Sequence, residues 1–219
     1  MHSPKKLILG AIAVVAVALA SQLNAAPVTQ ADFTTWSNAT NPGYSTVDFQ
    51  GIAGAPFGFV GSPYGSGGLT FTSNDNYLFG ANGSTGWDLG SGDYLLGKNY
   101  VGVSGFAASV SSFSIDLSVY SLPGSDVVTV NTSSGTYNYT VFTPGSNASA
   151  FFGFTLGAGE TLSSVVVTTQ NFGQGAGGNA VIDNVRFGAA GGVPDGGSTA
   201  LLLGVAGMGL WLARKRRVA

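Results

Sequence analysis

Apolar and polar residues alternate in several short runs through the middle of the chain. In Phe113–Tyr120, phenylalanine, isoleucine, leucine and valine alternate with serines and an aspartate, which is the two-residue period of a strand with one buried face. Further apolar or β-branched runs end at Gly, Ser, Asn or Pro, so they predict strands separated by turns. These runs are Ser45–Phe49, Gly68–Thr72, Tyr77–Phe79, Tyr100–Val103, Asp126–Asn131, Thr136–Phe142, Ala150–Leu156, Leu162–Thr169 and Ala180–Phe187.

No sustained helical period interrupts these runs between residues 26 and 192. Many short strands joined by turns predict an all-β fold, an antiparallel β-sandwich or jelly roll, which we place at residues 45–190. Residues 26–44 are polar and form either a loose arm or a short helix capped by Asp32. Gly51–Gly68 and Gly80–Gly92 are predicted to be long loops, where a binding site would lie.

The first 25 residues have the pattern of a secretory signal peptide. Lys5 and Lys6 precede an apolar run, Leu7–Ala20, and the small residue Ala25 marks the predicted cleavage point. Met1–Ala25 therefore predicts an N-terminal helix that directs export, with an uncleaved membrane anchor as the alternative.

The end of the chain has three parts in order. They are the turn-prone motif Val193, Pro194, Asp195, Gly196 and Gly197, the uncharged apolar segment Ser198–Ala213, and the basic cluster Arg214, Lys215, Arg216 and Arg217. A helix over the apolar segment would be roughly 24 Å long, slightly short of the usual transmembrane span of ~20 residues. A positive cluster stays on the cytoplasmic side, which predicts a transmembrane helix with the preceding residues outside.

This tail resembles the PEP-CTERM sorting signal of bacterial envelope proteins, in the variant class that begins Val-Pro-Asp instead of Pro-Glu-Pro. The resemblance implies that an exosortase, a membrane transpeptidase-like enzyme, recognises and processes the tail. It also implies a precursor anchored in the inner membrane and a mature protein at the cell surface or in an extracellular matrix, where exopolysaccharide is a candidate partner. A plain C-terminal membrane anchor is the alternative.

Charge and residue types exclude several classes of function. Between residues 26 and 192, nine acidic residues face two basic ones, Lys98 and Arg186, and an acidic surface repels the phosphates of nucleic acids. The chain has no cysteine, and its single histidine, His2, lies in the signal peptide. The mature domain therefore has no Ser–His–Asp or Cys–His catalytic group and no His-ligated zinc site.

Paired carboxylates leave a glycosidase open as a third interpretation. Asp88 and Asp93 flank a loop, and glycoside hydrolysis needs two carboxylates at a suitable separation. Aspartates in Gly- and Ser-rich loops also stabilise turns, which is the competing interpretation.

Asp183 conflicts with the pattern of the last predicted strand, Ala180–Phe187. Strict alternation puts its carboxylate on the same face as the two valines and the phenylalanine, toward the core, where an unpaired charge is costly. A bulge could re-aim the side chain, backbone N–H groups or Arg186 could bind it, or a structural Ca²⁺ could hold it together with Asp48. The Ile-Asp-Asn-Val run of this strand also resembles the closing strand of jelly-roll domains carried by PEP-CTERM proteins.

Four aromatic residues in or beside loops are candidate ligand contacts, namely Trp36, Trp87, Tyr64 and Tyr77. Exposed rings stack on sugar faces, and packing beneath the loops is the alternative. Export signals around a domain without His or Cys predict a non-catalytic envelope protein with a structural or adhesive sandwich and no cofactor beyond the Ca²⁺ option. A carbohydrate-binding module of the same fold is the alternative function.

Overall fold

The computed structural model describes residues 27–40, 43–52, 57–82, 92–118, 124–143, 149–170 and 178–191. The predicted signal peptide, the predicted sorting signal, Trp87 and Asp88 lie outside these residues. In the part that is described, no helix combines the length and the apolar character that a membrane crossing requires.

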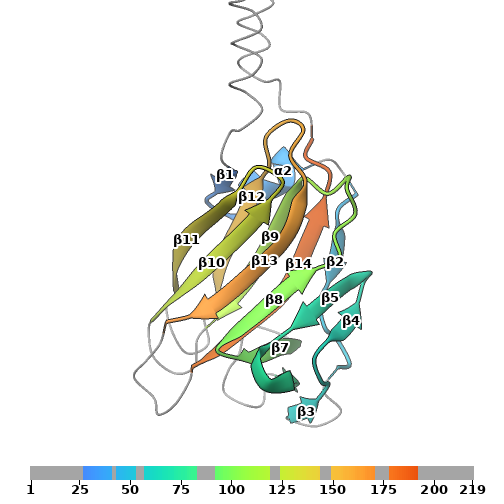
Figure 1. The fold of residues 1–219 in the computed structure, drawn as a ribbon, viewed down its shortest axis with the longest axis vertical. Helices are drawn as coiled ribbons and strands as arrows, with labels where there is room; N and C mark the ends of the chain where they lie inside the picture. The colour runs from blue at the N-terminus through green and yellow to red at the C-terminus, as the bar shows by residue number, and fades with distance from the viewer. Residues whose placement is uncertain are drawn as a thin grey trace, which may run out of the picture.

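Two antiparallel sheets form a β-sandwich (Figure 1). The eight-stranded sheet has the order β1-β12-β9-β14-β7-β6-β3, with β2 paired to β14, and the six-stranded sheet has the order β11-β10-β13-β8-β5-β4. The all-β antiparallel sandwich predicted from the sequence is therefore confirmed. In chain order the elements are β1 (Val28–Gln30), α2 (Phe33–Ala39), β2 (Ser45–Val47), β3 (Phe57–Phe59), β4 (Tyr64–Ser66), β5 (Leu69–Thr72), the 3-10 turn η1 (Asn74–Asn76), β6 (Leu78–Asn82), β7 (Asp93–Lys98), β8 (Tyr100–Ser104), β9 (Ser112–Ser118), β10 (Gly124–Thr132), β11 (Thr136–Thr143), β12 (Ala150–Thr155), β13 (Leu162–Thr169) and β14 (Asn179–Gly188).

The core lies between the two sheets and is built from alternate residues of each strand. Ile115 and Leu117 of β9 point inward from one sheet, Val165 and Val167 of β13 point inward from the other, and all four are fully buried. Burying one such side chain contributes about 1.5–3 kcal/mol. Because the chain has no cysteine, this packing and the backbone ladders hold the sheets together without disulfides.

Within residues 45–190, the hydrophobic pattern missed the strands β3, β4 and β7. β3 and β4 lie inside the predicted loop Gly51–Gly68, and each is a three-residue strand with a central glycine. Their pairing partners, β6 and β5, make them strands. β7 has four consecutive buried residues, Tyr94 to Gly97, so it is covered on both faces and shows no alternation.

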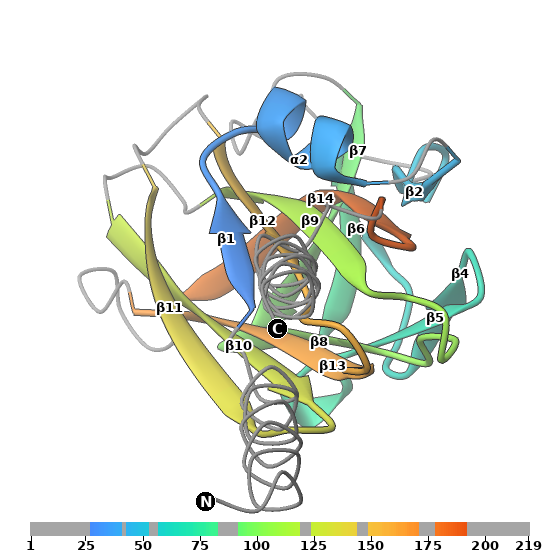
Figure 2. The ribbon, with the colours of Figure 1, turned by 90° about the horizontal axis from the view of Figure 1, so that it is seen from above.

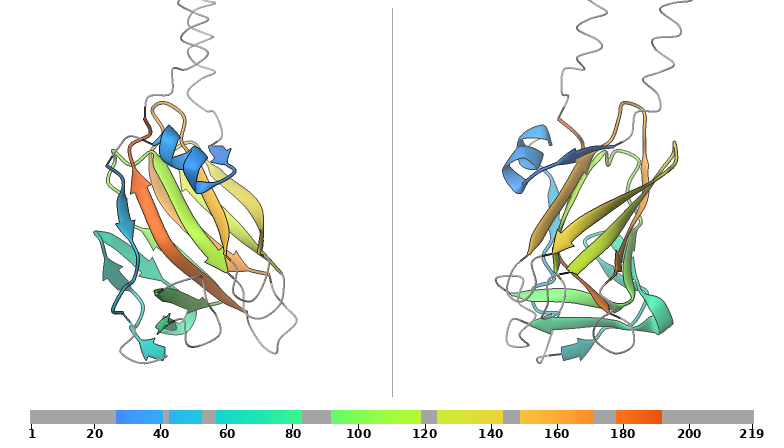
Figure 3. Two further views of the ribbon diagram at one scale, coloured as in Figure 1. Left: turned by 180° about the vertical axis from the view of Figure 1, so that it is seen from behind. Right: turned by 90° about the vertical axis from the view of Figure 1, so that its left-hand side faces the viewer.

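The described part of the predicted arm, residues 27–40, 43 and 44, packs against the sandwich. β1 extends the eight-stranded sheet by pairing with β12. Asp32 accepts a hydrogen bond from the Thr35 amide at 2.8 Å and caps α2, which confirms the helix alternative. α2 lies on the outer side of this sheet (Figure 2), and the views in Figure 3 agree. Its Trp36 is fully buried.

Replacing Asp32 by alanine tests whether this cap matters to the fold. The Asp32→Ala variant leaves an amide at the helix start without its acceptor and should lose about 1 kcal/mol of unfolding free energy. Asp32→Asn keeps an acceptor at the cap and should lose much less. Denaturant unfolding of both variants measures the difference, and equal losses would contradict a capping role.

Candidate functional site

The outward face of the six-stranded sheet carries no charged side chain in the strand residues that the structure describes. Val101 and Val103 of β8 point into the core, so Tyr100, Gly102 and Ser104 point outward. The strand registers carry this alternation across the sheet. The outward residues of β5, β13, β10 and β11 include Thr70, Thr72, Ser164, Val166, Thr168, Ser125, Val127, Thr129, Asn131, Thr136, Asn138, Thr140 and Phe142.

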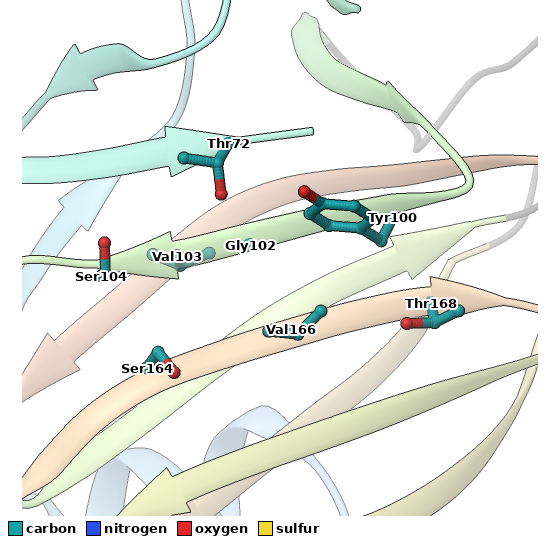
Figure 4. A pocket seen from close by; sticks show the side chains of 8 residues that line it. All are labelled: Thr72, Tyr100, Gly102, Val103, Ser104, Ser164, Val166 and Thr168. Atoms are coloured by element: carbon teal, nitrogen blue, oxygen red, sulfur yellow. The ribbon is translucent and has the colours of Figure 1, made fainter. Parts of the chain in front are cut away.

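A trough of about 450 Å³ opens on this face (Figure 4), and we call it the Tyr100 trough. It runs over β5, β8 and β13. Its lining residues are Thr72, Tyr100, Gly102, Val103, Ser104, Ser164, Val166 and Thr168. None of these side chains is an acid or a base, so the trough offers hydroxyl groups, an aromatic ring and aliphatic surface.

Gly102 forms the floor of the trough. A Cβ at this position would lie 2.6 Å from Thr72 Oγ1 and 3.7 Å from Tyr100 Cε2. The Tyr100 ring therefore lies next to the bare backbone of Gly102, and its side chain is half-buried. The missing side chain leaves the trough open between Thr72 and the aromatic ring.

Hydrogen bonds fix the polar side chains beside the trough. Asn131 donates to the Ser164 hydroxyl at 2.9 Å, and Thr129 donates to the Asn138 side-chain oxygen at 2.8 Å. Such cross-strand pairs hold the outward side chains in place. No side-chain hydrogen bond of the Thr72 or Thr168 hydroxyl is formed within the described part of the chain, so these groups are open to a ligand.

A second surface exposes aromatic rings at the β3 edge of the eight-stranded sheet. Phe57, Phe59 and Tyr77 are 49%, 65% and 48% exposed. Phe79 joins them, with ring centroids 5.4 Å from Phe59 and 5.3 Å from Tyr77. A cavity of about 210 Å³ beside them is also lined by Lys98, which forms an exposed ion pair with an aspartate at 3.3 Å.

The structure describes three of the four aromatic residues predicted as ligand contacts, and of these three only Tyr77 is exposed. Trp36 of α2 is fully buried, so its ring is not exposed for stacking on a sugar. Tyr64 is partly buried and faces inward, where its ring lies 6.2 Å from that of Phe71. Packing beneath the surface, the alternative interpretation, holds for both. Trp87 lies outside the described residues.

A bulge interrupts β14 at Asp183, and a bulge is one of the three alternatives that the sequence offered for this residue. The register against β9 shifts between Asp183 and Arg186, and Asn184 has a positive φ of 46°. Ile182 and Val185 both reach the core, and Asp183 is turned to the outer side of the sheet. The bulge thus keeps the apolar residues inside on both sides of the carboxylate.

Asp183 is nevertheless buried, with 2% of its surface exposed. Asn184 donates to its carboxylate from the backbone at 2.6 Å and from the side-chain amide at 3.0 Å. Burial, helped by the charge of Asp116, raises the pKa of Asp183 to about 7, although the Asn184 backbone hydrogen bond lowers it. Arg186 pairs with Asp116 at 2.9 Å and stacks on Phe33 of α2.

The predicted Ca²⁺ site at Asp183 and Asp48 stays a prediction. Asp48 lies near enough for its charge to contribute to the raised pKa of Asp183. Across the ranges that the structure covers, no group of three or more His, Cys, Asp or Glu residues is placed to hold a metal ion.

The predicted carboxylate pair of a glycosidase, Asp88 and Asp93, stays a prediction. Asp88 lies outside the described residues. Asp93 begins β7 and accepts a hydrogen bond at 2.8 Å from the amide of Gly51, which is far away along the chain.

Asp126 is a buried acid that the sequence did not single out. It is fully buried at one end of the core, opposite Thr169 of β13. In the described structure its two carboxylate oxygens lack a hydrogen bond of good geometry. Burial raises its pKa to about 7, and the nearby Thr169 hydroxyl offsets only part of this rise.

Comparison with known proteins shows a distant likeness in structure. No model of a known protein family matches the chain, and no curated protein matches it. A mutant of the family 29 carbohydrate-binding module CBM29-2, solved with mannohexaose, is similar in structure, with 14% identity and a TM-score of 0.34. The alignment covers 68% of this chain and 92% of that one. A likeness of this size carries no argument about the site, which rests on its own geometry.

The two raised pKa values predict that stability falls as pH rises. Asp126 and Asp183 hold protons in the folded state up to about pH 7, whereas in the unfolded chain they ionise near pH 4. Their contribution is therefore full below about pH 4 and is lost as pH rises through 7, by on the order of a few kcal/mol.

Asp126→Asn removes one of these groups and should reduce the fall in stability between pH 5 and pH 8. At pH 8 this variant should unfold at a higher denaturant concentration than the unaltered chain. Asp32→Asn changes an exposed acid and serves as the control. If the stability of Asp126→Asn falls between pH 5 and pH 8 as much as that of the unaltered chain, the raised pKa assigned to Asp126 is contradicted.

Proposed function

We propose that the β-sandwich is a non-catalytic module that binds a neutral polysaccharide in the Tyr100 trough. The observation that carries this proposal is a half-exposed aromatic ring beside a bare glycine, surrounded by hydroxyl groups on a sheet face without charge. Sugar rings present an apolar C–H face to an aromatic ring and hydroxyl groups to polar neighbours. The trough supplies both kinds of contact within one concave surface.

The charge of the domain supports a neutral ligand. Nine acidic and two basic residues lie between residues 26 and 192, so an anionic glycan would be repelled. The trough has no cationic side chain among its lining residues to offset this repulsion. Uronate-rich or sulfated polysaccharides should therefore bind more weakly than neutral ones.

The composition of the trough supports binding over catalysis. Glycoside hydrolysis requires two carboxyl groups on either side of the bond that is cleaved, and the residues lining the trough include none. Glycan binding also provides a physical basis for the adhesive role predicted from the export signals.

We further propose that the chain reaches the cell surface through its two terminal segments. The order of the motif Val193–Gly197, the apolar segment Ser198–Ala213 and the basic cluster Arg214–Arg217 supports exosortase-dependent sorting. Met1–Ala25 supports export by a signal peptide. An exported protein that carries a glycan-binding face would meet exopolysaccharide outside the cell.

Substitutions in the trough test the binding proposal. Tyr100→Ala removes the ring and should weaken binding of a neutral polysaccharide about tenfold, or ~1.4 kcal/mol. Tyr100→Phe keeps the ring and should lose much less. Gly102→Val fills the space beside Thr72 and should abolish binding. Isothermal titration with neutral glycans identified on a glycan array provides the measurement.

Phe142→Ala is the matched control for these variants. Phe142 is an aromatic residue on the same sheet face, 67% exposed and outside the trough. Its loss should leave the affinity unchanged. Equal affinities of the unaltered chain, Tyr100→Ala and Gly102→Val would overturn the assignment of this trough, and the absence of any glycan ligand would overturn the function.

Processing at the C-terminus is tested separately by intact-mass measurement. The protein released from cells of the native host should lack Arg214–Arg217, because the basic cluster remains with the removed tail. A released protein that retains these four residues would contradict cleavage and leave the plain membrane anchor as the interpretation.

A further inference from the structure

The four edges of the two sheets are unequal. In the described structure the strand path of the eight-stranded sheet ends in β1 and β3, with the three-residue β2 as a side branch on β14, and the six-stranded sheet ends in β4 and β11. β1, β3 and β4 have three residues each, whereas β11 has eight. A short edge strand offers few free backbone groups to another chain, so three of the four edges are protected by length.

β11 lacks the usual protection of a long edge. Its sequence, Thr-Tyr-Asn-Tyr-Thr-Val-Phe-Thr, has no charge, no proline and no glycine. Its register against β10 runs without a shift from Thr136 to Thr143, so no bulge turns the edge away. Within the described residues β11 pairs with β10 alone, and it lies at the margin of the sheet in Figure 1.

The side chains of β11 also leave apolar surface exposed that a neighbouring strand would cover. Phe142 is 67% exposed, so its ring offers apolar surface that a neighbouring strand would remove from water. On the inward side, Tyr137 and Val141 are only partly buried against the core. A strand added beside β11 would cover these residues and pair the free backbone groups at the same time.

We propose that β11 pairs antiparallel with β11 of a second copy of this chain. The two six-stranded sheets would then form one continuous sheet of twelve strands, six from each copy. An antiparallel pair of identical strands is self-complementary and closes about a two-fold axis. Two acidic domains can approach here because β11 contributes no charged side chain to the contact.

The symmetry of this pair determines where the two binding surfaces lie. A two-fold axis between antiparallel strands of one sheet is perpendicular to that sheet, so the outward faces of both copies point the same way. Both Tyr100 troughs would therefore open on the same side of the dimer. The strand pairing itself does not depend on what the trough binds.

A cysteine scan of the full-length chain tests the pairing, because the chain has no cysteine of its own. One cysteine is introduced in each of four variants, Thr136→Cys, Asn138→Cys, Thr140→Cys and Phe142→Cys, at the outward positions of β11. Cross-strand neighbours lie within disulfide distance. Thr168→Cys, an exposed outward position in the interior strand β13, is the control.

After mild oxidation, the variant whose cysteine lies nearest the two-fold axis should run mostly as a covalent dimer on a non-reducing gel. The other three should cross-link less, and Thr168→Cys should show background only. The axis can also pass nearest an inward residue, so background cross-linking in all four β11 variants overturns the proposal when the unaltered chain also has the mass of a monomer. Equal cross-linking of all four and of the control would also overturn it.

A mass measurement checks the same contact without cysteines. The full-length chain should sediment with twice the monomer mass, and the double variant Asn138→Lys, Thr140→Lys should return it to the monomer, because like charges then meet across the axis. The control Thr34→Lys, Asn38→Lys adds the same charge to exposed positions of α2 and should remain dimeric. A monomeric unaltered chain, or a dimer that survives the β11 lysines, would contradict the proposal.

Discussion

The alternation of side chains across the six-stranded sheet is the constraint on which the rest of the structure depends. Val101 and Val103 of β8 meet the core together with Val165 and Val167 of β13, and all four are fully buried. A slip of one residue in either strand would bring polar side chains inside and valines outside. The cost of that exchange fixes the register, and the register places the Tyr100 ring and the outward hydroxyl groups on one face.

The eight-stranded sheet meets the same constraint with one interruption. In β14, Ile182 and Val185 are both in the core although three positions separate them, which strict alternation does not allow. The bulge at Asp183 and Asn184 takes up the extra residue. The carboxylate leaves the core for the outer side of the sheet, where Asn184 bonds it and α2 packs nearby through the stacking of Phe33 on Arg186. The bulge therefore favours burial of hydrocarbon and still gives the acid hydrogen-bond donors.

The sequence predicted the fold well because most strands have one face toward the core and one toward solvent. It failed for β7, which is buried on both faces, and for β3 and β4, which are strands only because of their distant partners. The bulge was among the alternatives derived for Asp183, since a buried acid has few ways to be accommodated. The sequence did not predict the trough, because Tyr100 is the first residue of a predicted strand. The predicted ligand contacts were aromatic residues in or beside loops. Nothing in the pattern reveals that β8 and β13, far apart along the chain, lie side by side.

The lack of charge around the Tyr100 trough also determines how its contacts respond to the surroundings. Dissolved ions weaken the attraction between charges. They have little effect on stacking against a ring or on hydrogen bonds between hydroxyl groups, because neither contact involves a full charge. The side chains that line the trough include no carboxylate, amine, guanidinium or imidazole group. A molecule seated there would be retained to the same degree in fresh water, in brine and in mildly acid surroundings.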